Sequence, residues 1–454
     1  MANLPEGPTH QLAVFSSGLQ FSDIPGAVLE KSKQLLMDCL GNQIGAAVEA
    51  APRILYDTLE LEKLHGPSTV VGLGTKVPVT FAALMNGMLA HTLDMDDAHR
   101  DSLTKTGSAV TPAVLAVAEA LGSSGQDVLT AIVVGYEVMI RLGLAVNPSH
   151  RQRGFHSTAT LAVFGAAAAA GRLMKLTPGQ MASAFGVGGT QSSGLVAFIN
   201  NPSMTKAFNV GRGVQSGVLA ATLASKGFIG PPDILEHAEG FFKAYTNAVD
   251  VNRLTARLGS HFHTLESGFK PHAACRYAHG PIDAALLLMS NHGFGPDDID
   301  HIDVFVSELA YRQSNFYEPQ NVTSAQGSAP FSIAAGIVCK AKSLTVKDIK
   351  EAFENAATWE LHRNVHMHVD THMDYMGRGC RMGVYLKSGM CHQAAVTLPR
   401  GEPENPMQIE DVIEKFMAQA GPVTGKQKAL KLIKQVGKIE ACNSVAGLME
   451  CTVC

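Results

Sequence analysis

The chain has 454 residues, of which 46% are hydrophobic and 17% are charged, with 36 Lys and Arg against 40 Asp and Glu. A disordered chain would hold fewer apolar residues and carry more net charge, so this composition indicates a compact globular protein. The formal net charge of -4 and the lack of any block of Lys or Arg argue against a nucleic-acid-binding protein. Since a single core stops growing near ~250–300 residues, the length predicts two domains.

The N-terminal residues 1–15 show no basic region followed by an apolar stretch and a cleavage site. We therefore expect no signal peptide and a cytoplasmic protein. The most apolar run, residues 158–170, is shorter than the ~20 residues that span a bilayer, so we expect no membrane segment. Eight cysteines are too few for a disulfide framework, and the CxxC formed by Cys451 and Cys454 is expected to lie in a frayed tail.

Taken in chain order, the first half of the sequence reads as helices. From about residue 27 to residue 226, apolar residues recur at helical spacing and the breaks fall at Gly and Pro. Small residues dominate several of these segments, which allows helices to pack closely. This pattern predicts an all-helical domain over residues 1–262, with helices at 110–121, 126–142, 159–174 and 213–224.

The pattern changes after about residue 261. Residues 300–306, 383–386 and 393–398 alternate as half-buried strands do, among helices expected at 281–290 and 346–357. This predicts a smaller α+β domain with an antiparallel sheet over residues 263–399. Residues 400–454 are expected to form helices that return to the helical domain, so the fold class is mainly α.

Three carboxylates, Asp94, Asp96 and Asp97, lie close together just before a turn and a new helix. They cannot all ionise easily unless cations or backbone donors oppose them. One interpretation is a capped loop at the start of a helix. Another is a site for a hard cation, although no Glu follows at the distance where a bidentate ligand would be expected.

Five motifs, in order over nearly the whole chain, carry a resemblance to a known family. They are HTLDMDDAH from His91, GFHSTAT from Gly154, NPSMTKAFNVGRG around Lys206, KPHAACRYAHGPIDA from Lys270, and PRGEPENPM from Pro399. Together they resemble the MmgE/PrpD family. The resemblance implies a cofactor-independent enzyme, commonly a homodimer, that acts on small di- or tricarboxylates. It also implies an active site between a helical domain and an α+β lid domain.

The resemblance places the catalytic positions of the family on Asp94, His156, Lys206 and Lys270, with Arg276 following in the last of these motifs. A substrate with several carboxylates needs several cations in one cleft, which this set would supply. On local sequence alone, His156 would be a buried core histidine and Lys206 a solvated lysine.

Three positions depart from the family pattern. Lys105 lies seven residues before Pro112, where other members carry histidine, Ala98 replaces the usual Thr, and Phe331 replaces a Tyr. Loss of water needs an acid aimed at the departing hydroxyl, and these changes remove three such polar groups.

The departures favour an isomerase, an epimerase that inverts a carbon alpha to a carboxylate on iminodisuccinate or a similar acid. Lys105 and His156 would be catalytic with Lys206, and Tyr136 is an alternative proton donor. The expected substrate-binding residues are Asp94, Asp97, Lys270, His272 and Arg276. Two alternatives stay open: a dehydratase or decarboxylase acting on 2-methylcitrate or cis-aconitate, and a binding protein that has lost turnover.

A histidine-rich segment suggests a metal site, with His362, His366, His368 and His372 at short spacing. A helix would place the first two on one face. Asn364 and Val365 make a helix doubtful there, and the resemblance implies an enzyme without a metal, so we expect no metal and no other cofactor. The partners that the resemblance implies are a small anionic substrate and a second copy of the chain.

Overall fold

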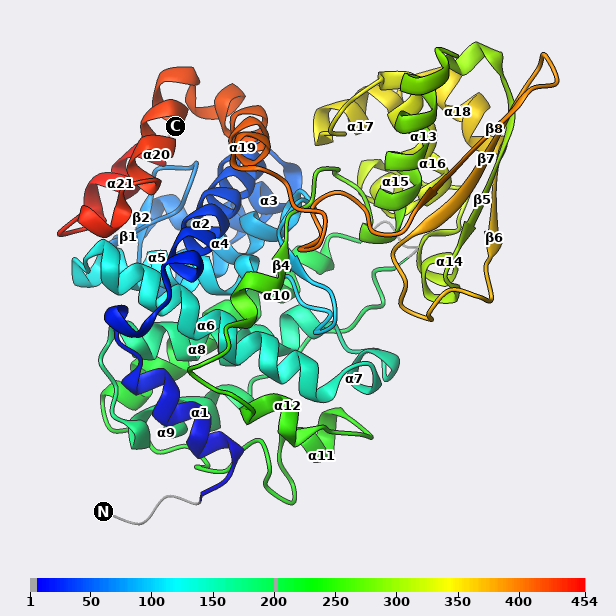
Figure 1. The fold of residues 1–454 in the computed structure, drawn as a ribbon. Helices are drawn as coiled ribbons and strands as arrows, with labels where there is room; N and C mark the ends of the chain where they lie inside the picture. The colour runs from blue at the N-terminus through cyan, green and yellow to red at the C-terminus, as the bar shows by residue number, and fades with distance from the viewer. Residues whose placement is uncertain (1–5, 200–202, 454) are drawn as a thin grey trace. The chain divides into compact units, whose positions relative to one another are not determined.

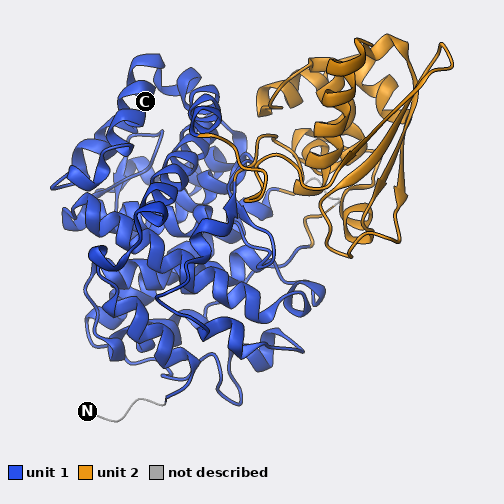
Figure 2. Cartoon of the chain, viewed as in Figure 1, with its two compact units in different colours: residues 1–196, 204–268, 409–454 blue, residues 197–203, 269–408 orange. Residues whose placement is uncertain are grey.

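The computed structural model describes residues 6–199 and 203–453, and the chain divides into two compact units (Figure 2). Unit 1 comprises Met1–Val196, Met204–Gly268 and Ile409–Cys454, and unit 2 comprises Ala197–Ser203 and Phe269–Gln408. Unit 1 is helical, whereas unit 2 combines helices with a four-stranded sheet (Figure 1). The expected fold class, mainly α with a smaller α+β part, is confirmed.

Unit 1 is built from helices and two very short pairs of strands. The helices are α1 (Pro8–Gly18), α2 (Gly26–Ala46), α3 (Ala50–Thr58), α4 (Val79–Thr92), α5 (Thr106–Leu121), α6 (Gly125–Val146), α7 (Ser149–Gln152), α8 (Ser157–Leu173), α9 (Pro178–Gly189), α10 (Thr205–Ser225), α11 (Phe241–Tyr245), α12 (Val251–Thr255), α19 (Ile409–Thr424), α20 (Lys426–Val436) and α21 (Ala446–Cys451). The antiparallel pairs are β1 (Ser68–Thr69) with β2 (Lys76–Val77) and β3 (Ala98–His99) with β4 (Ser267–Gly268).

Helix α8 forms the centre of unit 1 and packs against α5, α6 and α10. Nearly all of its residues are buried, including the alanine run 166–170. The helices approach closely because α10 carries glycines at the contact. A Cβ on Gly213 would lie 2.6 Å from the carbonyl oxygen of Ala159, and a Cβ on Gly217 would lie 2.5 Å from that of Val163. The small-residue pattern therefore fixes the helix spacing at the core.

Helix α6 is long and apolar enough to cross a membrane by length and composition alone. Its 22 residues begin at a capping box, in which the Ser124 hydroxyl accepts a hydrogen bond from the backbone N–H of Asp127. The apolar window is entirely buried inside the protein, which is the environment of a core helix.

Unit 2 carries one sheet in the order β6-β5-β7-β8, with helices α13 and α16 packed together over one face (Figure 1). The strands are β5 (Ile299–Val306), β6 (Val365–Val369), β7 (Cys380–Leu386) and β8 (Cys391–Val396). The helices are α13 (His279–His292), α14 (Glu308–Ser314), α15 (Val322–Gly327), α16 (Ala329–Cys339), α17 (Val346–Phe353) and α18 (Ala356–Arg363).

The sheet is mixed, so the expectation of an antiparallel sheet is wrong in part. Strands β5, β7 and β8 pair antiparallel, but β6 pairs with β5 in parallel, with Val304 opposite Met367. A parallel pair needs a crossover connection, and helices α14 to α18 provide it. His362 is buried near the end of α18, whereas His366 is exposed on β6. The two histidines therefore do not share a helix face.

The C-terminal segment is not frayed up to Val453. Cys451 is buried at the end of α21, and the carbonyl oxygen of Thr452 accepts a hydrogen bond from the backbone N–H of Gly72 at 3.0 Å. The expected loose tail is therefore wrong for these residues, because backbone pairing and burial hold them. Cys454, the second cysteine of the CxxC, lies outside the described residues.

Candidate active site

The acidic cluster forms a loop in unit 1 between α4 and α5. Helix α4 ends at Thr92, and Asp94 adopts a left-handed backbone with φ of 53°, which turns the chain sharply. The Asp94 carboxylate lies 2.8 Å from the ammonium nitrogen of Lys206, in the first turn of α10. The sequence motifs around Asp94 and Lys206 therefore meet in space.

Two histidines lie beside this ion pair. His91, in the last turn of α4, bonds through Nδ1 to Oδ2 of Asp96 at 2.6 Å. Its ring stacks on that of His156, with centroids 5.5 Å apart. His156 occupies the N-cap position of α8, and its backbone N–H donates to the carbonyl oxygen of Gly194. The C-terminal end of α4 and the N-terminal end of α8 therefore place the two imidazole rings against each other.

Asp97 caps the start of α5. Its Oδ1 accepts a hydrogen bond from the backbone N–H of Gly107 at 3.0 Å, and its Oδ2 accepts one from the hydroxyl of Tyr136 at 3.1 Å. A Cβ on residue 107 would lie 2.1 Å from Asp97 Oδ1 and 2.6 Å from the Tyr136 hydroxyl, so glycine is required there. Lys105 precedes this helix, and its backbone N–H donates to Oγ1 of Thr158 on α8.

A buried lysine from the C-terminal segment contacts the acidic loop. The ammonium group of Lys415, on α19, lies 2.5 Å from Oδ1 of Asp38 on α2 and 2.5 Å from the carbonyl oxygen of Met95 in the loop. The Lys415 and Asp38 side chains are 4% and 1% exposed. Two distant segments of the chain, α2 and α19, therefore help to fix the loop that carries Asp94, Asp96 and Asp97.

Charge and burial perturb several groups of this cluster. Burial, with the neighbouring carboxylates of Asp38 and Asp96, raises the pKa of Asp97 to about 8. Burial also lowers the pKa of His156 well below its usual value, and the ammonium and guanidinium groups of Lys206, Lys105 and Arg151 act in the same direction, as does His91 when it is protonated. The cluster thus holds a neutral imidazole among cations, an arrangement typical of sites that bind anions and move protons.

The structure brings together Asp94, Lys206, His156 and Lys105, and it joins Asp97 to Tyr136 by a hydrogen bond. The catalytic and binding roles of these residues stay predictions. Sequence reasoning did not assign roles to His91, Asp96 or Lys415. His91 and Asp96 lie within HTLDMDDAH, one of the five motifs that resemble the family, whereas Lys415 lies in none of these motifs.

The remaining predicted binding residues lie in unit 2, in a buried ion cluster. Glu402 Oε1 accepts hydrogen bonds from Nε of Arg276 at 2.9 Å and from Nη1 of Arg378 at 2.6 Å. The two guanidinium groups hold the pKa of Glu402 at about 2. A substrate carboxylate that bound to Arg276 would therefore share its guanidinium group with Glu402.

His272 is similarly engaged by protein groups. Its Nδ1 accepts from the backbone N–H of Leu344, so the proton lies on Nε2, which donates to Asp283 at 3.0 Å. Lys270 is 1% exposed and lies near enough to His279 for its charge to lower the pKa of that imidazole. The binding roles of His272 and Lys270 stay predictions.

A second group of histidines in unit 1 surrounds Glu266. Its carboxylate lies 3.1 Å from Nε2 of His99, 2.9 Å from Nδ1 of His263 and 2.8 Å from Nε2 of His261. These types of ligand suit a transition metal. However, Nδ1 of His99 accepts from the backbone N–H of Ser102, and Nδ1 of His261 accepts from Arg257. Both Nε2 atoms therefore carry protons directed at Glu266, which fits a hydrogen-bonded clasp better than a metal site.

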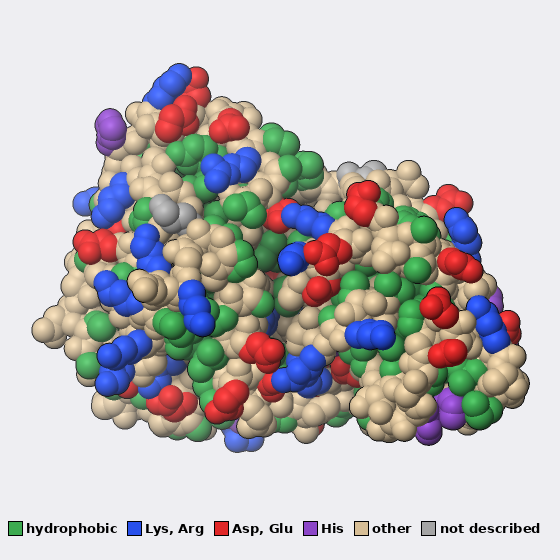
Figure 3. All heavy atoms as spheres, turned by 90° about the horizontal axis from the view of Figure 1, so that it is seen from above, with side chains coloured by type: hydrophobic (Ala, Val, Ile, Leu, Met, Phe, Trp, Pro, Cys, Tyr) green, Lys and Arg blue, Asp and Glu red, His purple; other side chains and the backbone are tan. Residues whose placement is uncertain are grey.

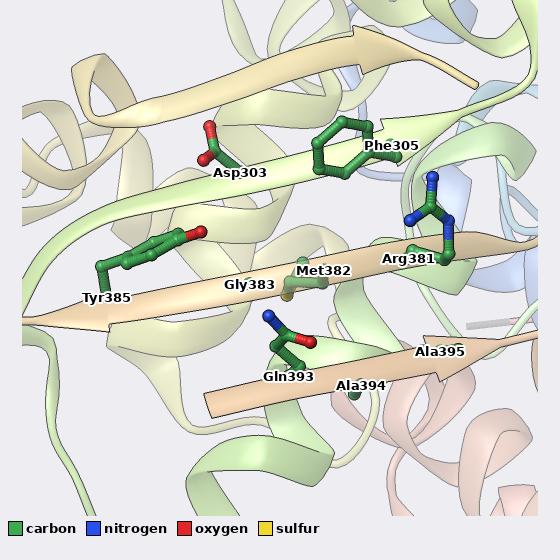
Figure 4. Close-up of a pocket in the computed structure, with 9 residues that line it drawn as sticks. All are labelled: Asp303, Phe305, Arg381, Met382, Gly383, Tyr385, Gln393, Ala394 and Ala395. Carbon is green, nitrogen blue, oxygen red and sulfur yellow. The ribbon is translucent and has the colours of Figure 1, made fainter. Parts of the chain in front are cut away.

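A shallow pocket lies on the sheet of unit 2 (Figure 4). Phe305 from β5 and Tyr385 from β7 flank Gly383, which leaves a hollow because it has no side chain. The charged groups here are already paired, Arg381 with Asp370 at 2.7 Å and Asp303 with His368 at 2.9 Å. This pocket is therefore a poorer candidate for catalysis than the cluster in unit 1.

The face shown in Figure 3 intersperses basic with acidic side chains and has no continuous basic band.

Comparison with known proteins identifies the family. The MmgE/PrpD N-terminal domain matches residues 10–254, and the MmgE/PrpD C-terminal domain matches residues 272–439. The chain belongs to the MmgE/PrpD family. Among its relatives, the chain is 27% identical to cis-aconitate decarboxylase of Aspergillus terreus over all of its own length and 97% of the relative's. It is 26% identical to that of Homo sapiens, covering 97% of this chain and 94% of the relative.

These MmgE/PrpD relatives correct the expected activity. The chain is similar to decarboxylases, which are lyases, so the expectation of an epimerase of iminodisuccinate is wrong. Phe331, one of the three positions on which that expectation rested, is fully buried and contacts the rings of Phe353, Trp359 and His362 in unit 2. Family membership and these relatives still support an enzyme.

Proposed function

We propose that this chain is a lyase that releases carbon dioxide from a small unsaturated tricarboxylate of the cis-aconitate type. The observation that carries the proposal is its similarity to cis-aconitate decarboxylases over its whole length. The cluster around Asp94 and Lys206 supports it, because the cluster combines ammonium groups with an imidazole held neutral.

The proposed reaction needs one proton donor and cations for the carboxylates that remain. In cis-aconitate, a CH2 group bearing a carboxylate is attached to a carbon–carbon double bond conjugated with the other carboxylates. Breaking the bond between the CH2 carbon and its carboxylate releases carbon dioxide and leaves an allylic carbanion. The double bond then shifts, and a proton delivered to the far carbon gives a methylene-substituted dicarboxylate.

This chemistry suits the residues better than dehydration does. No hydroxyl departs, so the acid that dehydration requires is not needed, and Ala98 in place of Thr is no obstacle. We assign Lys206 and Lys105 to the carboxylates and to proton delivery, since ammonium groups can do both.

We assign His156 to the leaving carboxylate. A cation at that position would stabilise the bound substrate more than the transition state, because the departing group loses its negative charge. A neutral imidazole can orient the carboxylate without that penalty, and burial among cations keeps His156 neutral.

The test is to incubate the purified full-length chain with cis-aconitate in heavy water. We expect one carbon dioxide per substrate consumed and a product with one new deuterium on the carbon next to a carboxylate, detected by NMR. Absence of carbon dioxide release, together with a raised melting temperature in the presence of cis-aconitate, would refute the lyase and favour a binding protein.

A further inference from the structure

The two stacked histidines of unit 1 have opposite electrostatic surroundings. His91 lies in the last turn of α4, where the helix dipole favours a positive charge, and it bonds to the carboxylate of Asp96 at 2.6 Å. His156 lies at the N-cap of α8, where the helix dipole disfavours a positive charge. Four basic groups, those of His91, Lys206, Lys105 and Arg151, act to lower the pKa of His156.

The groups that act on His91 are different. Burial, helped by the ammonium group of Lys206, lowers the pKa of His91, although the carboxylates of Asp96 and Asp94 act against this decrease. The pKa of His156, which has no such opposing carboxylate among its main causes, is lowered further. The His91 side chain is fully buried, and its Nε2 has no hydrogen-bond partner among the described residues. A buried imidazole nitrogen left without a partner needs an explanation, because most such groups are satisfied.

We propose that Asp96 and His91 form a buried positioning dyad that orients the His156 imidazole and keeps it neutral. Asp96 fixes the Nδ1 proton of His91 toward itself, so the first proton that the two stacked rings take up as the pH falls goes to His91, where a carboxylate compensates its charge. In many enzymes, two neighbouring titratable groups have different pKa values because their surroundings differ. One of the two then acts as the acid and the other as the base.

The dyad matters for the proposed reaction, on which this part of the inference rests. If His156 became cationic, it would hold the carboxylate that must leave and slow the release of carbon dioxide. His91 bonds to Asp96 and stacks on His156, so in this proposal it acts through His156 and should affect turnover more than substrate binding.

The test replaces His91 with Phe, which keeps a stacked ring but removes the charge and the bond to Asp96. The primary measurement is an NMR titration of the His156 ring in the full-length chain labelled at histidine and assigned with His156→Gln. We expect the pKa of His156 to rise in His91→Phe by about half a unit or more, because His91 takes up its proton first in the wild type and its charge then opposes a second proton on His156. This measurement needs no substrate, so it stands even if cis-aconitate is not turned over.

The kinetic measurement follows carbon dioxide release from cis-aconitate as a function of pH. We expect kcat of His91→Phe to fall roughly tenfold or more with KM nearly unchanged, and the acidic limb of the profile to move to higher pH. His91→Gln, which can still donate a hydrogen bond to Asp96, is the second variant in case Phe prevents folding, and the same rise in the pKa of His156 is expected for it.

The control is His150→Phe, since His150 is also buried and stacks on Phe155 at 5.0 Å but bonds to Thr160 and the Tyr245 carbonyl instead. It should lower the melting temperature without moving the His156 titration. An unchanged His156 titration in both His91 variants, with only a lower melting temperature, would overturn the proposal and leave His91 a structural residue.

Discussion

Replacing Glu402 with Gln should destabilise unit 2 strongly. The carboxylate compensates two buried guanidinium groups, with contacts of 2.8 Å to Arg276 and 2.6 Å to Arg378, and all three side chains are 6% exposed or less. Removing one partner of a buried ion cluster costs about 3–5 kcal/mol. The pKa of Glu402 gives a similar figure, because its decrease from 4.5 to about 2 corresponds to about 3–4 kcal/mol at about 1.4 kcal/mol per unit.

The assay is urea denaturation followed by tryptophan fluorescence. The chain has one tryptophan, Trp359, whose indole donates to the carbonyl oxygen of Phe353 in unit 2, so the signal reports this unit. The matched control is Glu354→Gln, at an exposed position of the same unit. We expect the free energy of unfolding to fall by about 3 kcal/mol for Glu402→Gln and to stay within about 0.5 kcal/mol for the control.

The difference between wild type and Glu402→Gln should also depend on pH. The pKa of Glu402 is lowered in the folded protein, so its stabilisation is present above pH 4.5 and is lost as the pH falls from 4.5 toward 2. Equal unfolding free energies for Glu402→Gln and the control at neutral pH would refute the reasoning, as would a difference that persists unchanged at the acidic end.

Three further predictions concern unit 1. The raised pKa of Asp97 stabilises the protein fully below pH 3.8 and decreasingly toward pH 8, so the melting temperature of Asp97→Asn relative to wild type should rise over that range; a constant difference would contradict this. Gly107→Ala should cost about 1–3 kcal/mol by overpacking in a denaturant titration, whereas Gly18→Ala, with nothing within 4 Å, should not. Lys415→Met leaves buried Asp38 without its cation and should cost about 3–5 kcal/mol in a similar titration; a loss below 1 kcal/mol would count against its anchoring role.

Much of the fold could be predicted because it follows from local patterns. The helix expected at residues 159–174 is α8 at Ser157–Leu173, and the strand expected at 300–306 is β5 at Ile299–Val306. The parallel pairing of β6 could not be predicted, since it depends on which distant strand lies beside β5 rather than on the alternation within β6.

Residues of the candidate site could be predicted where they lie in motifs of the family. Contacts that form only when distant segments fold together could not. The pairing of Asp94 with Lys206 joins two recognised motifs. The bond between His91 and Asp96 spans the end of a helix, so no helical spacing indicates it, and Lys415 reaches the acidic loop from a segment with no motif. The choice of reaction failed because it rested on single departures from the family pattern, at Ala98, Lys105 and Phe331, which do not by themselves specify a reaction.

The most direct test of the account is the rate of carbon dioxide release from cis-aconitate by wild type, Lys206→Met and Lys226→Met. Lys206 pairs with Asp94 at the start of α10, whereas Lys226 is an exposed lysine at the other end of the same helix. The account predicts release by wild type and by Lys226→Met, and a rate at least about a hundredfold lower for Lys206→Met. Equal rates in Lys206→Met and wild type, or no release by wild type, would contradict it.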